Sequence, residues 1–219
     1  RKRMREWTAH VRSDVFRLRM ATQYHTTCHG FRNFHLVRRF AKTHPEYFKM
    51  NKDGTRYLID TEKKPYSRNG KLCLSNRGLR EEIYRDVKAF LTGQPASSRG
   101  LKRWGLNCVK DRAGNYVDIM PEDGFRPCHC PNCQAAYDKT RGDYATELIW
   151  KMTADIASRL QKEGVAGGVT QMAYSPYRDV PSCALPTNVD VMVAVHGPWS
   201  TLDEKRNAVQ LKTVRGWAE

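Results

Sequence analysis

The residue types that could carry out chemistry concentrate in one stretch, residues 115–133, which reads NYVDIMPEDGFRPCHCPNC. Its first part, 116–120, is a short and mostly apolar run, which is typical of a buried strand. The run ends at Pro121 and is followed at once by two adjacent carboxylates, Glu122 and Asp123. If the protein is an enzyme, we therefore expect its active centre at the end of this strand.

Glu122 and Asp123 have the chemistry for general acid catalysis. Neighbouring side chains point in opposite directions on an extended backbone, but both can reach one cleft where a strand breaks into a loop. A carboxylic acid in a partly apolar cleft can have a raised pKa and donate a proton, while its partner stays ionised. Cleavage of a glycosidic bond requires this division of labour. A second interpretation, which the pattern alone slightly favours, has Glu122 at the surface and Asp123 in a turn with Gly124.

Three cysteines follow the carboxylates with the spacing C-x-C-x-x-C, namely Cys128, Cys130 and Cys133. Structural zinc is usually four-coordinate, so three thiolates need a further ligand. Cys73 is the natural fourth candidate because it precedes the helix expected before the central strand, and His129 is a weaker one. A structural zinc ion is one interpretation; a disulfide among these cysteines, or reduced thiols in a tight loop, are the alternatives. We expect no cofactor to be required for catalysis.

Histidine and aromatic side chains stand beside the ends of the predicted strands. His25 and His29 lie near the end of the first strand, Tyr174 ends the third, and Trp199 follows the last. Aromatic rings combine apolar area with a polar tip and can pack against sugar faces. Each residue alone is more often structural, but their repetition at strand ends makes all four candidate substrate contacts.

Hydrophobic periodicity predicts alternating helices and strands. A further helix begins at a cap formed by Ser75 or Asn76 and carries an apolar stripe as far as Leu91. The other predicted helices are 3–19, 34–42, 144–162 and 202–217, and the predicted strands are 20–28, 116–120, 169–174 and 188–195. Strands alternating with helices indicate a parallel sheet, and polar loops after the strands are typical of a TIM-like (β/α) barrel. Because a whole barrel needs eight strands, we expect a single α/β domain, 1–219, that forms only part of a larger barrel.

The chain is strongly basic, with 38 Lys and Arg residues against 23 Asp and Glu and a formal net charge of +15. This balance favours acidic partners. The basic residues are scattered rather than clustered as a tail, and no helix-turn-helix, RNP or zinc-finger spacing is present. We therefore favour a solvated basic surface and do not expect nucleic acid as a partner. No apolar run approaches the roughly 18 residues of a membrane span, so we expect no membrane partner either. The oligomeric state is not determined by the sequence.

Four sequence segments together resemble a known family. HGF (29–31), THPEYFKMNKDGTR (43–56), LCLSN (72–76) and PEDG-x3-C-x-C-x-x-C (121–133) occur in this order. The order resembles a bacterial family known as a domain of unknown function, some members of which are placed in glycoside hydrolase family 163.

The resemblance implies an exported TIM-barrel enzyme, extracellular or periplasmic, with members acting as endo-β-N-acetylglucosaminidases on N-glycans. Such enzymes are expected to use the substrate's acetamide as nucleophile, while one carboxylic acid protonates the leaving oxygen and a second carboxylate steers the acetamide. By resemblance these groups are Glu122 and Asp123. Many relatives have Asn at the position of Glu122, so Asp123 is the safer catalytic candidate and Glu122 a positioning group.

Our leading hypothesis is a glycoside hydrolase that cleaves a β-linked N-acetylhexosamine-type glycan by general acid catalysis, with or without assistance from the substrate. The alternative is a non-catalytic carbohydrate-binding or structural module stapled by the cysteine cluster. A zinc-stabilised nucleic-acid binder is a third and weaker hypothesis.

Overall fold

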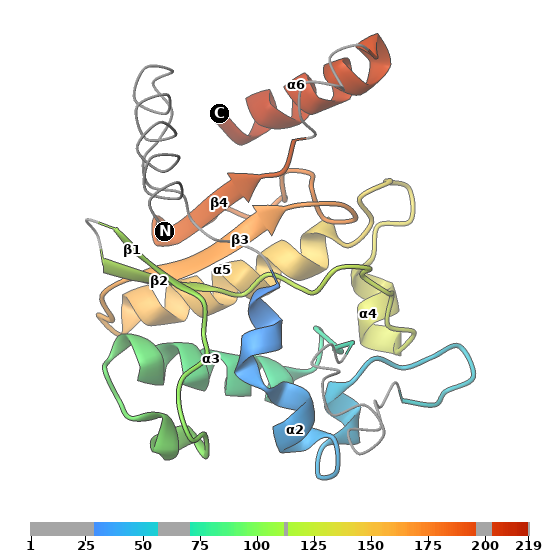
Figure 1. Ribbon diagram of the computed structural model, residues 1–219. Helices are drawn as coiled ribbons and strands as arrows, with labels where there is room; N and C mark the ends of the chain where they lie inside the picture. The colour runs from blue at the N-terminus through green and yellow to red at the C-terminus, as the bar shows by residue number, and fades with distance from the viewer. Residues whose placement is uncertain (1–28, 57–70, 112–113, 196–202, 219) are drawn as a thin grey trace, which may run out of the picture.

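The computed structural model describes residues 29–56, 71–111, 114–195 and 203–218 (Figure 1). The predicted helix 3–19, the predicted strand 20–28 and the candidate residues His25 and Trp199 lie outside these ranges. The described residues form a mixed α/β structure in which helices pack beside one small sheet.

The sheet has the strand order β1-β2-β3-β4, with β1 at Cys108–Asp111, β2 at Gly114–Asp118, β3 at Gly168–Ala173 and β4 at Val189–Val193. Strands β2, β3 and β4 pair in parallel, which confirms the predicted parallel sheet. Strand β1 was not predicted and pairs with β2 in the antiparallel direction. Within the described ranges the sheet is open, so these residues show a three-stranded parallel sheet with one antiparallel neighbour rather than a closed barrel.

Helix α5, Thr146–Lys162, lies between β2 and β3 in the chain and packs against β3. It confirms the helix predicted at 144–162, and the predicted face is buried: Leu148, Ile149, Met152, Ile156 and Leu160. No helix was predicted between the strands 169–174 and 188–195, and β3 indeed reaches β4 through the irregular segment 174–188.

Helix α3, Arg77–Leu91, begins at Asn76, whose side-chain oxygen accepts a hydrogen bond from the Leu79 amide at 2.9 Å. Of the two predicted caps, Asn76 is therefore the one used. Leu79 and Ile83 are fully buried on the side of α3 that faces the core, and α3 contacts α5.

The remaining helical elements are short, apart from the last. They are the 3-10 helix η1 (Gly30–Phe34), α2 (Leu36–Phe40), η2 (Pro45–Tyr47), η3 (Ala96–Arg99), α4 (Pro131–Ala136) and α6 (Glu204–Ala218). The predicted helix 34–42 is thus a shorter helix preceded by a 3-10 turn, and α6 confirms the final predicted helix. Within the described residues, no helix is both long enough and apolar enough to cross a membrane.

The turn that carries HGF is docked against the end of β2. The amide of Phe31 donates to the carbonyl of Met120 at 3.1 Å. Gly30 lies so close to β2 that a Cβ atom at this position would be 2.2 Å from the carbonyl oxygen of Asp118. Only glycine permits this approach, which brings the residue before it, His29, to the loop after β2.

Candidate functional site

The two predicted catalytic carboxylates lie in the loop that follows β2, and His29 lies between them. His29 Nδ1 is 3.3 Å from Glu122 Oε2, and His29 Nε2 is 3.3 Å from Asp123 Oδ2. The backbone amide of Asp123 also points to Nδ1, at 3.3 Å. The structure therefore brings together three of the predicted site residues at the carboxyl end of a parallel strand.

The hydrogen bonds determine where the imidazole carries its proton when it is neutral. Because Nδ1 accepts from the Asp123 amide, Nε2 carries the hydrogen and points it at the Asp123 carboxylate. Nδ1, whose one lone pair accepts from this amide, also lies beside Glu122 Oε2. His29 thus has a proton donor side towards Asp123 and a proton acceptor side towards Glu122.

Glu122 and Asp123 have opposite surroundings. Glu122 is 7% exposed, and neither of its carboxylate oxygens has a hydrogen-bond partner among the described residues. Burial raises the pKa of Glu122, although the positive charges of His29, Arg32 and Lys71 partly oppose this. The Asp123 side chain is 67% exposed. Asp123 can therefore contact a substrate, whereas Glu122 is placed to hold a proton behind it.

A small cavity adjoins Glu122 and is lined by Phe31, Lys71, Pro121 and Phe125, among others. Its volume is about 30 Å³, which is enough for one or two water molecules but not for a sugar ring. Lys71 closes one side by donating to the carbonyl oxygen of Asp123 at 2.6 Å. A sugar would have to reach the site at the exposed Asp123 side.

Tyr174 follows β3 directly, as predicted, and is half-buried against the hydrophobic core. Its carbonyl oxygen accepts a hydrogen bond from the Tyr177 amide at 2.7 Å, which forms the turn after the strand. The strand end therefore matches the prediction, while a role of Tyr174 in substrate contact stays a prediction.

The four predicted cysteine ligands are brought together. Cys73, Cys128, Cys130 and Cys133 are all buried, and their sulfur atoms lie within 4.8 Å of one another. Cys73 Sγ is 3.5 Å from Cys130 Sγ and 3.9 Å from Cys133 Sγ. None of the four forms a disulfide. His129 is not part of the group.

Backbone and hydroxyl groups surround these sulfur atoms. The Met50 amide points at Cys128 Sγ at 3.2 Å, and the Cys133 amide at Cys130 Sγ at 3.4 Å, at the start of α4. Ser75 Oγ lies 3.0 Å from Cys133 Sγ. These donors favour thiolates over thiols. Hydrogen bonds with the neighbouring thiols of Cys133 and Cys73 lower the pKa of Cys128, and the matching hydrogen bonds with Cys128 and Cys73 raise the pKa of Cys133.

The arrangement fits a tetrahedral metal ion. With zinc–sulfur bonds of about 2.3 Å, the sulfur atoms of a four-thiolate site stand about 3.8 Å apart. The Cys73 distances of 3.5 and 3.9 Å bracket this value. The four buried cysteines can therefore bind a metal ion such as zinc.

A family model described as Domain of unknown function (DUF4838) matches residues 2–219. The chain belongs to this family. No curated protein and no solved structure matches the DUF4838 chain significantly. Family membership agrees with the coarser part of the resemblance, a domain of unknown function, and the relation to glycoside hydrolase family 163 stays a prediction.

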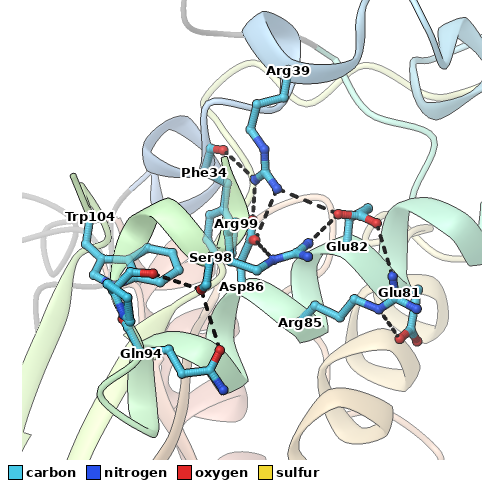
Figure 2. A network of polar contacts seen from close by, with 11 residues as sticks. Phe34, Arg39, Glu81, Glu82, Arg85, Asp86, Gln94, Ser98, Arg99 and Trp104 are labelled. Carbon is cyan, nitrogen blue, oxygen red and sulfur yellow. Dashed lines mark hydrogen bonds and ion pairs between the residues drawn. The ribbon is translucent and has the colours of Figure 1, made fainter. Parts of the chain in front are cut away.

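Sequence reasoning about the DUF4838 chain missed a second group of polar residues. Arg39 of α2 and Arg99 of η3 converge on Asp86 of α3, and both also reach Glu82 (Figure 2). Asp86 is 1% exposed. The signal was present in the helix pattern, because Asp86 falls between Ile83 and the end of the apolar stripe on the same face.

Proposed function

We propose that this chain carries the catalytic carboxyl group of a glycoside hydrolase acting on a β-linked N-acetylhexosamine-type glycan. The observation that carries the proposal is the imidazole of His29 between a buried and an exposed carboxyl group. Asp123 is the group that would touch the glycan, and Glu122 acts through His29 as a positioning residue. The class of sugar is proposed from the resemblance. The exposed side chain of Asp123 supports contact between this residue and a glycan.

The geometry supports a proton path to the glycosidic oxygen. Protonated Asp123 gives its proton to the leaving oxygen as the bond to the anomeric carbon breaks. The Asp123 carboxylate then takes the proton of His29 Nε2, and Nδ1 gives up its hydrogen bond from the Asp123 amide to take a proton from the buried Glu122. The anomeric carbon is attacked by water or by the acetamide of the substrate, and solvent returns a proton to Glu122.

Two further features belong to this proposal. The parallel strands β2, β3 and β4, with the carboxylates after β2, support placing the chain in a (β/α) barrel whose active site lies at the carboxyl ends of the strands. On the resemblance we also propose that the protein acts outside the cytoplasm, in the extracellular or periplasmic space.

The test is hydrolysis of a panel of N-glycans and β-N-acetylhexosaminides by the intact protein. We expect Asp123→Asn to abolish cleavage. The matched control is Asp155→Asn, which removes an exposed carboxylate from α5. Glu122→Gln should lower the rate less and shift the pH profile, because it removes a proton store rather than the group in contact with substrate. Cleavage that survives Asp123→Asn unchanged would refute the assignment.

One observation favours a non-catalytic carbohydrate-binding or structural module as the second candidate. The cavity beside Glu122 holds only about 30 Å³, whereas sites for small molecules usually have about 300–1,000 Å³. Glycan binding by the intact protein without any turnover would support this candidate.

We also propose that the cysteine cluster holds a structural zinc ion. Four protein ligands leave no open position for water, so the ion would stabilise the fold and take no part in hydrolysis. We expect one zinc per chain by elemental analysis, and a loss of zinc in Cys73→Ser. Cys183→Ser is the control, because Cys183 is a free cysteine outside the cluster. A metal-free protein that keeps its stability would overturn the proposal.

A further inference from the structure

A cleft of about 1100 Å³ lies between α2 and the chain that follows η3. Basic side chains line both of its walls. Arg38 and Arg39 come from α2, and Arg99, Lys102 and Arg103 come from the opposite wall. The cleft is separate from the carboxylate loop and from the cysteine cluster, so neither of the functions proposed above uses it.

The floor of the cleft is held by the network drawn in Figure 2. Arg39 and Arg99 bind the buried carboxylate of Asp86, with 2.7 Å between Arg99 Nε and Asp86 Oδ1, and both also contact Glu82. Both arginines of the floor are therefore paired with carboxylates, and Arg85 also contacts Glu82, at 3.7 Å. The floor presents both hydrogen-bond donors and carboxylate oxygens.

The basic side chains at the rim of the cleft are not paired in this way. Arg38, Lys102 and Arg103 are exposed, and none of them has an ion-pair partner within the described part of the chain. Trp104 lies beside them and is held in place by a hydrogen bond from its Nε1 to the Gln94 carbonyl at 2.8 Å. The cleft therefore joins three uncompensated cations to one fixed aromatic ring.

We propose that this cleft binds an acidic oligosaccharide, with the three rim cations holding carboxylate or sulfate groups and Trp104 packing against a sugar face. Sugar hydroxyl groups can donate hydrogen bonds to the Glu82 carboxylate in the floor. The choice of a sugar rests on the proposed function; the choice of a negatively charged one rests on the cleft itself.

Nucleic acid fits this cleft less well. Binding of single strands commonly uses successive stacked bases along an open groove. The ring of Trp104 offers one fixed stacking position. An acidic sugar chain satisfies both the cationic rim and the mixed floor.

The cleft and the carboxylate loop meet at the same end of β2. On one side, the Asn107 carbonyl, just beyond the cleft wall, accepts a hydrogen bond from the Asp118 amide at 3.0 Å. On the other side, Gly30 packs against the carbonyl of Asp118. Helix η1 stands between the two sites, since its Phe31 lines the small cavity and its Asn33 lines the cleft. The cleft is thus placed to hold an acidic part of the same glycan that the carboxylates would act on.

The test is direct binding by calorimetry, without any measurement of cleavage. The probes are an oligogalacturonate, a heparin-derived oligosaccharide, a neutral chito-oligosaccharide and a single-stranded oligonucleotide of equal charge. One variant combines Arg38→Gln, Lys102→Gln and Arg103→Gln. The matched control combines Lys52→Gln, Lys162→Gln and Lys212→Gln, which removes the same charge from exposed positions elsewhere.

We expect at least one acidic oligosaccharide to bind, and the two acidic probes to distinguish carboxylate from sulfate recognition. The rim variant should bind it roughly tenfold more weakly, and the control variant should bind as the native protein does. Equal loss in both variants, preference for the neutral probe, or tightest binding of the oligonucleotide would overturn the inference. If an acidic oligosaccharide binds but no glycan is cleaved, this inference stands and the proposed hydrolase is refuted. If glycans are cleaved but no acidic oligosaccharide binds, the hydrolase stands and this inference is refuted.

Discussion

Cys73 Sγ lies 3.5 Å from Cys130 Sγ, although 57 residues separate the two along the chain. With a metal ion bound, the cluster ties the start of α3 to the start of α4. Because such an ion binds the folded state alone, removing it should destabilise the protein. We expect a strong chelator to lower the thermal unfolding midpoint by roughly 10 °C, since about 4 kcal/mol corresponds to that shift in a chain of this size. Added zinc should restore the midpoint, and a chelator without effect would contradict the prediction.

The network beneath the basic cleft should be sensitive to the loss of one partner. Asp86→Asn leaves Arg39 and Arg99 facing each other with less negative charge between them. We expect the free energy of unfolding to fall by about 3–5 kcal/mol, as for other buried ion pairs that lose one member. Arg206→Gln is the control; its exposed pair with Asp203 should be worth under about 1 kcal/mol. Urea unfolding measures both, and similar losses would count against a buried network.

Gly30→Ala should disturb the carboxylate site without touching a carboxylate. The added Cβ would stand 2.2 Å from the carbonyl oxygen of Asp118, so η1 must move away from β2 and take His29 with it. We expect a loss of about 1–3 kcal/mol in unfolding free energy. Gly142→Ala is the matched control because a Cβ there meets nothing within 4 Å. Unchanged stability in Gly30→Ala would show that the turn docks less tightly than described.

Glu122 should make stability depend on pH in a defined direction. Its pKa is raised by burial above the ordinary value of 4.5, so the folded protein binds the proton more tightly than the unfolded chain. The free energy of unfolding therefore falls as pH rises through the window above the unfolded pKa. Glu122→Gln removes this fall and should gain stability relative to the native protein as the pH rises above 4.5.

Glu46 supplies the control of opposite sign. Hydrogen bonding to its own backbone amide, chiefly, and to His44 lowers the pKa of this exposed carboxylate. Its contribution is present above the unfolded pKa and is lost as pH falls, so Glu46→Gln should show no relative gain at high pH. Urea unfolding across the range measures both variants. If the unfolding free energies of the two variants changed with pH in the same direction relative to the native protein, burial would not be raising the pKa of Glu122.

Local patterns predicted the elements that have a strong period or a clear cap. Asn76 before an apolar stripe located α3, and the spacing from Leu148 to Leu160 located α5. The cysteine spacing, together with Cys73, located the four-thiolate cluster, because ligand types leave a chemical signature in the sequence.

Features built from distant segments could not be predicted in this way. Strand β1 is short and pairs with β2 in the antiparallel direction, and its four residues have neither the length nor the alternation that mark a strand in the sequence. Asp86 falls on the apolar face of the predicted helix, but its partners Arg39 and Arg99 come from two other elements, and no local pattern identifies them. His29 was predicted near the site, but its position between the carboxylates depends on the docking of Gly30 against β2.

The order of protein synthesis gives the cysteine cluster a further consequence. Cys73 leaves the ribosome 60 residues before Cys133, and β2 and the carboxylate loop are made in between. The four thiolates can therefore coordinate a metal ion together only after Cys133, the last of them, has been added. The concentration of free metal ion at that stage of synthesis would then determine what fraction of new chains forms the cluster that holds the loop with Glu122 and Asp123 in place.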